Sequence, residues 1–374
     1  MMIAGETSGD IHGAGLIRCL RKNNKNIDFF GIGGSRMLEE KFRPYYMLET
    51  LQAHGLFEVI LHLPRLYKTL WEMRFVMLKE HPDALILIDY PGFNLKLASY
   101  AKGKGIPVIF FNSPQIWAWR KGRLNTIRRA VDKMIVLFPF EKEIYQQAGV
   151  DVKWVGHPLL DQKISKKEHI SFLTHFKIRT DIPVLVIAPG SRPSEMRRHL
   201  PTLIESLPHI QNAVGKIQCI LPITGSLNLK EVKKIIESST VPIKLIMDKF
   251  LDSIHSCDAA IVASGTASLR TGLALKPFVI IYRVSPLTFW VASSLTKTKH
   301  IGMVNILAEK EIAPELLQED FKITKVVETT IKLLQDKAYR AKMIGELEKI
   351  RSNLGTRGAY QKAASYIEDY IFKN

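Results

Sequence analysis

The chain has 374 residues, of which 46% are hydrophobic and 24% charged, and it carries a formal net charge of +17. This length predicts two domains, and this composition is typical of a globular protein with a full core. No stretch approaches the roughly 18 apolar residues of a membrane-spanning helix, and the N-terminus lacks the basic and apolar regions of a signal peptide, so we expect a cytoplasmic protein.

The cysteine spacing and the net charge limit the kinds of structural site and binding partner. Cys19, Cys219 and Cys257 are far apart and lack CxxC spacing, which argues against a disulfide framework or a zinc knuckle. A charge of +17 is compatible with nucleic acid, an anionic membrane, an anionic substrate or simply a solubilising surface. Because the lysines are spread widely and no nucleic-acid motif occurs, we expect no nucleic-acid partner.

The first motif is a glycine-bracketed loop, GETSGD, at residues 5–10. Loops that bind phosphate use backbone N–H groups and positive charge, and they avoid acidic side chains. This loop instead offers the oxygens of Glu6, Ser8 and Asp10. It is therefore better suited to hydroxyl groups or to a cation than to phosphate.

Residues 53–77 form a dense apolar stretch in which Arg65, Lys68 and Arg74 are interleaved. One interpretation is a core helix with one buried face. The other is an interfacial segment on a membrane, where each lysine or arginine near anionic lipid adds about 1 kcal/mol to binding. The candidate membrane patch consists of Leu56, Phe57, Leu63, Leu66 and Leu70.

Short apolar runs rich in Val and Ile recur after this stretch and predict the fold. Most lack polar alternation, which is typical of parallel strands covered on both faces, and the amphipathic stretches between them predict βαβ units. The runs fall into two groups, so we predict an α/β protein with two doubly wound, Rossmann-like domains facing a cleft. The predicted domains are 1–160 and 161–345, with a C-terminal helix in 346–374 that can return to the first domain. The predicted strands are 84–89, 107–111, 133–138, 152–156, 183–188, 218–223, 243–247, 259–263 and 278–282.

Asp89 stands at the end of the first of these runs. Ligands of doubly wound sheets bind beyond the carboxyl ends of the strands, so an acid at this point is more easily explained by function than by packing. Asp89 is a candidate general base, a role worth about 10²–10⁴-fold in rate. An aspartate that caps the following turn would give the same pattern.

The run 183–188 leads into the segment APGSRPSE (188–195), which is typical of a strand, a turn and a helix start. Gly190 and Ser191 make a compact turn, and Arg192 would project from the beginning of the helix. A guanidinium beside N–H groups at a helix start is a good clamp for a diphosphate. The alternative is an ordinary surface arginine.

A second junction of this kind is ASGTASLR (263–270), where Gly265 and Thr266 are small enough for a phosphate to approach the backbone. The alternative is a close-packed turn. Other chemistry has little support, because no HExxH or GxxxxGK[ST] motif occurs and residues 31–37 lack the full GxGxxG pattern. We therefore expect no bound metal and neither NAD nor a P-loop.

Nine segments in order resemble one enzyme family along nearly the whole chain: the lipid-A-disaccharide synthases, which are inverting glycosyltransferases of the GT-B type. The most specific of them are the GETSGD start and the tryptophan-rich SPQIWAWR (113–120). The matching segments are 4–17, 31–37, 88–98, 113–123, 137–145, 155–161, 189–195, 263–269 and 305–318.

The resemblance implies that the donor is UDP-2,3-diacylglucosamine and that the acceptor is 2,3-diacylglucosamine 1-phosphate. The products would be a β-1,6-linked lipid A disaccharide 1-phosphate and UDP. No metal or other cofactor is implied. The enzyme would work as a peripheral protein on the inner face of the bacterial inner membrane, and a homodimer is left open.

The resemblance also assigns roles to residues. Asp89 would deprotonate the 6-hydroxyl of the acceptor, and the stretch 56–70 would dock on the bilayer. Glu6, Ser8 and Asp10 would line the acceptor side, where they contact sugar hydroxyls or order neighbouring loops. The second domain would bind the UDP donor through Ser191, Arg192, Gly265, Thr266, Asn305 and Glu311.

Two alternatives remain at this point. One is another UDP-sugar enzyme of the GT-B type, such as a peptidoglycan glycosyltransferase or a UDP-sugar epimerase, against which the segment 113–120 argues. The other is a membrane-associated relative that has lost its catalytic activity.

Overall fold

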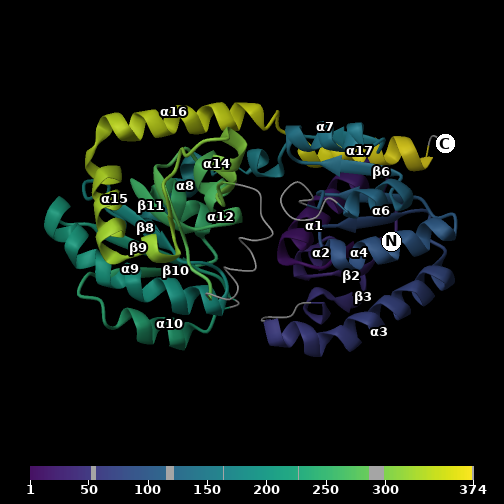
Figure 1. The fold of residues 1–374 in the computed structure, drawn as a ribbon, viewed down its shortest axis with the longest axis horizontal. Coiled ribbons are helices and arrows are strands. Elements are labelled where there is room, and N and C mark those ends of the chain that lie inside the picture. The colour runs from purple at the N-terminus through teal and green to yellow at the C-terminus, as the bar shows by residue number, and fades with distance from the viewer. Residues whose placement is uncertain (52–55, 115–121, 163, 226, 286–298, 373–374) are drawn as a thin grey trace. The chain divides into compact units, whose positions relative to one another are not determined.

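The computed structural model describes all residues except 52–55, 115–121, 163, 226, 286–298 and 373–374, and it describes no side chain between 56 and 62. The chain divides into two compact units (Figure 1). The first unit consists of Met1–Asp161 together with Leu354–Asn374, and the second of Gln162–Asn353.

The first unit is built on a seven-stranded, fully parallel sheet with the order β3-β2-β1-β4-β5-β6-β7. Every residue of the central strands β1, β4 and β5 is buried, as expected for apolar strands covered on both faces. The strands are β1 (Met2–Ala4), β2 (Phe30–Gly33), β3 (Arg43–Met47), β4 (Leu85–Ile88), β5 (Val108–Phe111), β6 (Lys133–Val136) and β7 (Val152–Trp154).

Helices flank this sheet, and one of them comes from the end of the chain. The last helix, α17, packs against α1, where Nδ1 of His12 lies 2.9 Å from the hydroxyl oxygen of Tyr360. A Cβ atom at Gly15 would lie 2.5 Å from the Tyr360 ring, so this contact requires glycine. The helices are α1 (Thr7–Asn23), α2 (Ser35–Glu39), η1 (Leu48–Thr50), α3 (Leu56–Glu80), α4 (Pro91–Gly103), α6 (Arg123–Ala130), α7 (Pro139–Gln147), η2 (Pro158–Asp161) and α17 (Ala359–Phe372).

The second unit has a six-stranded parallel sheet with the order β10-β9-β8-β11-β12-β13. Its strands are β8 (Val184–Ala188), β9 (Gln218–Ile223), β10 (Ile243–Met247), β11 (Ala259–Ala263), β12 (Phe278–Tyr282) and β13 (Glu315–Leu317). Its helices are α8 (Lys166–His175), α9 (Pro193–Val214), α10 (Leu229–Ile236), α11 (Phe250–Ser256), α12 (Thr266–Leu273), α14 (Met303–Ala308), η3 (Gln318–Asp320), α15 (Ile323–Gln335) and α16 (Lys337–Asn353).

Each sheet has one point where the strand order reverses. It lies between β1 and β4 in the first unit and between β8 and β11 in the second. Doubly wound sheets bind their ligands beyond the carboxyl ends of the strands at this switch point. The four loops singled out in the sequence follow β1, β4, β8 and β11, so they flank the two switch points.

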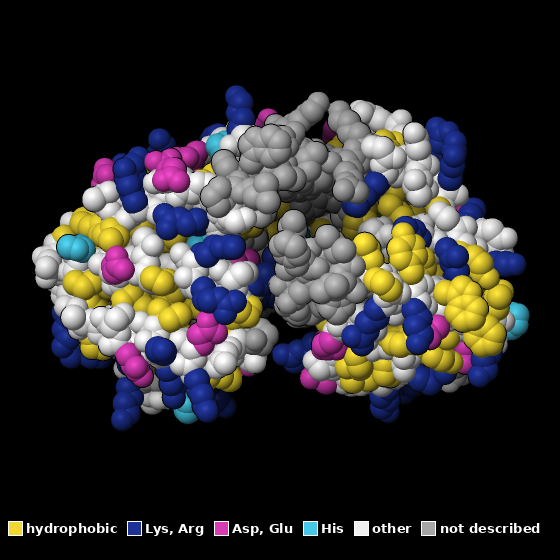
Figure 2. Space-filling view, turned by 60° about the horizontal axis from the view of Figure 1, so that its bottom comes forward, with side chains coloured by type: hydrophobic (Ala, Val, Ile, Leu, Met, Phe, Trp, Pro, Cys, Tyr) yellow, Lys and Arg dark blue, Asp and Glu magenta, His cyan; other side chains and the backbone are white. Residues whose placement is uncertain are grey.

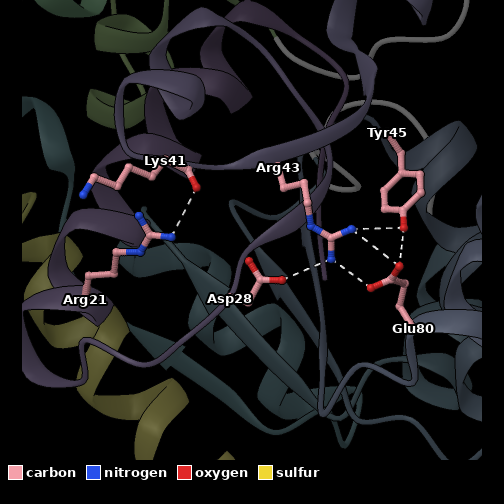
Figure 3. A network of polar contacts seen from close by, with 6 residues as sticks. All are labelled: Arg21, Asp28, Lys41, Arg43, Tyr45 and Glu80. Atoms are coloured by element: carbon pink, nitrogen blue, oxygen red, sulfur yellow. Dashed lines mark hydrogen bonds and ion pairs between the residues drawn. The ribbon is translucent and has the colours of Figure 1, made fainter.

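An ionic network fixes the C-terminal end of α3 to the edge strand β3 (Figure 3). The guanidinium of Arg43 donates to Glu80 at 2.8 Å and to Asp28 at 3.1 Å, and the Tyr45 hydroxyl also donates to Glu80. Hydrogen bonds from Arg43 and then Tyr45 lower the pKa of Glu80 to about 2. Because the network is exposed, its main effect is to set the direction of α3 rather than to add much stability.

Candidate active site

Asp89 begins the bend that follows β4, and this bend has an unusual backbone. Asp89 and Tyr90 both adopt left-handed conformations, with φ angles of 51° and 47°. Such conformations are unfavourable for residues other than glycine and cluster at functional sites. The buried side chain of Asn94 holds the bend, because its amide donates to the carbonyl oxygens of Ile88 at 3.2 Å and Asp89 at 2.7 Å.

The carboxylate of Asp89 has two neutral hydrogen-bond donors among the described residues. The amide of Asn112 donates to Oδ1 at 2.7 Å, and the hydroxyl of Ser8 lies 3.4 Å from Oδ2. Burial, and then the negative charge of Glu6, raise the pKa of Asp89 to about 7. A carboxyl group with such a pKa can accept and release a proton near neutral pH.

Two residues of the loop after β1 act on Asp89, and the third predicted residue, Asp10, orders a neighbouring turn, which is one of the two roles predicted for this loop. Glu6 is exposed and its charge acts on Asp89, and the Ser8 hydroxyl contacts the Asp89 carboxylate. Asp10 is buried, and its carboxylate orders the turn between β2 and α2. It accepts the backbone N–H groups of Gly34 (2.8 Å), Arg36 (3.0 Å) and Met37 (3.0 Å).

In the second unit, the loop between β8 and α9 presents Arg192 to solvent at the beginning of α9. The N–H groups of Ser191 and Arg192 donate to the Glu195 carboxylate at 3.1 and 3.3 Å, and the Arg192 guanidinium lies 3.7 Å from it. Glu195 therefore occupies the position at this helix start that the sequence predicts for a phosphate.

The loop between β11 and α12 exposes Gly265 and Thr266 at the start of α12. Gly265 has a φ angle of 124°, a conformation open only to glycine. The loop is braced by two hydroxyl groups, since Ser264 donates to the carbonyl of Ile301 at 3.1 Å and Ser268 to that of Gly265 at 2.8 Å. The backbone here is open to an approaching anion.

A family model described as lipid-A-disaccharide synthetase matches residues 1–368. The chain belongs to the lipid-A-disaccharide synthase family. The synthase of Trichlorobacter lovleyi is 39% identical over 98% of this chain and 96% of its own length, and that of Geobacter sulfurreducens is 38% identical over 100% and 97%. As a member of this family, the chain is a glycosyltransferase of lipid A biosynthesis.

Solved structures confirm the GT-B fold of this synthase family member. A UDP-GlcNAc 2-epimerase of Neisseria meningitidis bound to UDP-GlcNAc has a TM-score of 0.63 and 14% identity, covering 100% of this chain and 99% of its own. The MurG protein of Acinetobacter baumannii has a TM-score of 0.58 and 13% identity, covering 99% and 98%. At these identities the likeness establishes the fold alone.

Asn305 and Glu311, which the resemblance to the synthases places near the nucleotide, differ in exposure. Glu311 is exposed. Asn305 is buried, and its amide group has a full set of partners within the chain. Its Nδ2 donates to the Ala313 carbonyl (2.7 Å) and Glu315 (2.8 Å), and its Oδ1 accepts the N–H groups of Ile312 (2.8 Å) and Ala313 (3.0 Å).

His199, which is not among the residues predicted from the sequence, joins two loops of the second unit. The buried imidazole lies 2.6 Å from the Pro189 carbonyl oxygen through Nδ1, and its Nε2 accepts the N–H of Arg283 at 3.0 Å. Burial lowers the pKa of His199, which favours the neutral ring that this pairing requires. The apolar positions around it on α9 give no sequence signal for such a contact.

The predicted membrane patch is only partly exposed in this synthase. Leu63 is 43% exposed and Leu66 is half-buried, but Leu70 is 5% exposed and belongs to the core, so its assignment to the patch is wrong. The side chains of Leu56 and Phe57 lie outside the described residues. An exposed apolar row, which we call the α3 row, consists of Leu63, Tyr67, Trp71, Phe75 and Leu78.

Figure 2 shows hydrophobic side chains gathered on the face of the first unit that α3 covers, with lysines and arginines among them. None of the helices, as far as the chain is described, is both long and apolar enough to cross a bilayer. The same part of the chain contains no cluster of three or more histidine, cysteine or acidic residues suited to a metal ion.

Proposed function

We propose that the chain transfers diacylglucosamine from UDP-2,3-diacylglucosamine to the 6-hydroxyl of 2,3-diacylglucosamine 1-phosphate. The products are the β-1,6-linked lipid A disaccharide 1-phosphate and UDP. The observation that carries this proposal is the Asp89 carboxylate, which stands at the switch point of the first sheet with a pKa of about 7. Family membership supports the choice of substrates.

In the proposed step, Asp89 takes the proton of the acceptor 6-hydroxyl while that oxygen attacks the anomeric carbon of the donor. The bond between this carbon and the diphosphate oxygen breaks, and its electron pair leaves with UDP. Attack from the face opposite to the leaving group inverts the anomeric configuration. The carboxylate must be ionised before the step, so turnover rises with pH through the pKa of Asp89.

The donor-side roles rest on Arg192, Gly265 and Thr266. We propose that the exposed guanidinium and the backbone N–H groups of the β11–α12 loop stabilise the negative charge that develops on the leaving diphosphate. The diphosphate competes with Glu195 for the N–H groups at the start of α9. Asn305 acts by ordering the segment around Ile312, next to the exposed Glu311.

On the acceptor side, we propose that Glu6 and Ser8 contact hydroxyl groups of the acceptor sugar. Glu6 is exposed at the beginning of α1, and Ser8 lies beside the base. Asp10 contributes indirectly, because it holds the turn that follows β2. Contacts with sugar hydroxyls suit the chemistry of this loop, which offers oxygen acceptors and no positive charge.

We propose that the α3 row docks on the inner face of the inner membrane, where the acylated substrates reside. The row repeats every three or four residues along one helix face, as an interfacial helix requires. Arg65, Lys68 and Lys79 are exposed on the same helix, and each adds about 1 kcal/mol on anionic lipid. On this proposal the protein works as a peripheral enzyme on the cytoplasmic side of the membrane.

The proposal is tested by incubating the purified full chain with both lipid substrates in mixed micelles. We expect UDP release in step with formation of the disaccharide 1-phosphate, and no UDP release when either lipid is omitted. A parallel incubation offers UDP-N-acetylglucosamine with water-soluble sugar acceptors. Turnover there that matches or exceeds turnover with the lipids would overturn the substrate assignment in favour of another UDP-sugar enzyme.

A further inference from the structure

Asn112 lies beside Asp89 for a topological reason. It follows β5 as Asp89 follows β4, and the last residues of these two strands, Ile88 and Phe111, are paired in register. Asn112 has a φ angle of 62°, so both strands end in a left-handed residue and turn at the same level. Its backbone N–H donates to the Ile135 carbonyl of β6 at 3.0 Å, which anchors it to the sheet.

Two acidic side chains among the described residues disfavour the ionised form of the Asp89 carboxylate. Glu6, which directly precedes α1, and Glu141 on α7 both act on it with negative charge. His12 of α1 packs against Phe111, with ring centroids 5.7 Å apart, and is paired with Tyr360. Among the described residues no lysine or arginine forms an ion pair with Asp89. The ionised form therefore depends on neutral donors.

Of the two neutral donors, Asn112 is the stronger. Its amide donates to Oδ1 at 2.7 Å, a short distance typical of a bond to an ionised acceptor, whereas the Ser8 hydroxyl is 3.4 Å from Oδ2. A donor on Oδ1 fixes the plane of the carboxylate. The other oxygen, Oδ2, has only the weak contact with Ser8 and can therefore take a proton from a substrate.

We infer that Asn112 is a positioning residue for the transfer reaction: its amide orients the Asp89 carboxylate and favours the ionised form that accepts the acceptor's proton. This inference rests on the proposed function, because it assumes that Asp89 is the base. It assigns Asn112 no contact with substrate. Its effect should therefore show in kcat and in the pH profile, and not in substrate binding.

The test compares Asn112→Leu, which is close to asparagine in size but cannot donate, with the parent enzyme. Both are assayed as full chains with both lipid substrates between pH 5.5 and 9.5. Loss of one hydrogen bond to a charged group should move the rising limb of kcat upward by about one to two pH units. At pH 7 kcat should fall about 5- to 50-fold and recover at high pH, with KM for each lipid within about two-fold.

Three further variants make the result decisive. Ser8→Ala should shift the rising limb of kcat less than Asn112→Leu does, because the contact of Ser8 with Asp89 is longer. If the leucine variant does not fold, Asn112→Ser replaces it and should give an intermediate shift. Asp89→Asn should lose about 10²–10⁴-fold in kcat at every pH. An unmoved limb in folded Asn112 variants, or an equal loss of kcat at all pH values, overturns the inference alone. Substantial activity in Asp89→Asn overturns the proposed function itself.

Discussion

The carboxyl group of Asp89 should reduce the stability of the first unit at neutral pH. Its pKa is raised from 3.8 to about 7 by burial and then by Glu6. Between these two values the folded chain keeps the proton that the unfolded chain releases. Stability therefore falls as the pH rises from about 4 to 7, and it stays at the lower level above pH 7.

The stability of Asp89→Asn should differ from that of the parent, whatever its activity. The asparagine cannot ionise, so the variant should be more stable than the parent by about 2 to 4 kcal/mol at pH 7, with the difference vanishing near pH 4. Urea unfolding at a series of pH values measures this. Equal stability of the two proteins at pH 7 would show that the ionisation of Asp89 is not opposed by its surroundings.

Single residues differ in how far their roles can be predicted from the sequence. The position of Asp89 follows from a rule about strand ends, because the acid comes directly after an apolar run. The roles of Asp10 and Asn305 depend on backbone N–H groups of other segments, at Gly34 and Ile312 for example. No spacing in the sequence indicates such partners, so the oxygen-rich loop could be predicted but not the direction of each side chain.

At the level of elements, α3 combines a core face and an exposed apolar face. Leu70 is 5% exposed and its neighbour Trp71 is 67% exposed, although both are apolar. Successive helix residues point about 100° apart, so one sequence step separates the core from the surface. The apolar content of the stretch predicts a helix, but it cannot show which face is turned outward.

This contrast gives a prediction with a built-in control. Trp71→Ser should lower the binding of the chain to vesicles with anionic lipid at least several-fold, without changing its melting temperature. Leu70→Ser should instead destabilise the first unit by about 2 to 5 kcal/mol, because it opens a cavity in the core. Vesicle co-sedimentation and thermal unfolding measure the two effects.

The matched control for Trp71→Ser is Ile170→Ser, since Ile170 on α8 is 52% exposed and belongs to the second unit. It should leave vesicle binding unchanged. The account of the α3 row fails if Trp71→Ser binds vesicles as tightly as the parent, or if the control loses as much binding.

Apolar runs in the sequence predict most of the strands, but not all of them. The nine runs predicted as strands correspond to β4 through β12, and they are mostly apolar, although Lys153 in β7 and Lys244 in β10 interrupt two of them. None of the predicted strand ranges covers β2 or β3. β2 contains Gly31 and Gly33, and β3 is a half-exposed edge strand with a proline, Pro44, in its sequence. Such strands form because a neighbour pairs with them rather than through local preference.

At the scale of the whole molecule, the two units repeat one design. In both sheets the first strand of the unit, β1 or β8, lies in the middle. The order of the strands reverses beside it. The alternation of strands and helices predicts this architecture from sequence. The chain returns to the first unit at Leu354, after the long helix α16, and α17 then packs against α1. The sequence predicts that a C-terminal helix can return in this way, but the contact of α17 with α1 joins distant segments, which a single sequence does not specify.

The central claim is that the Asp89 carboxylate is the base for glycosyl transfer, and turnover by Asp89→Asn tests it most directly. The variant should bind UDP like the parent and keep its fold, while kcat with both lipid substrates falls by about 10²–10⁴-fold. Because the substitution is expected to stabilise the fold, such a loss could not be attributed to unfolding. A variant that turns over within about three-fold of the parent would contradict the claim, because another group would then have to accept the proton.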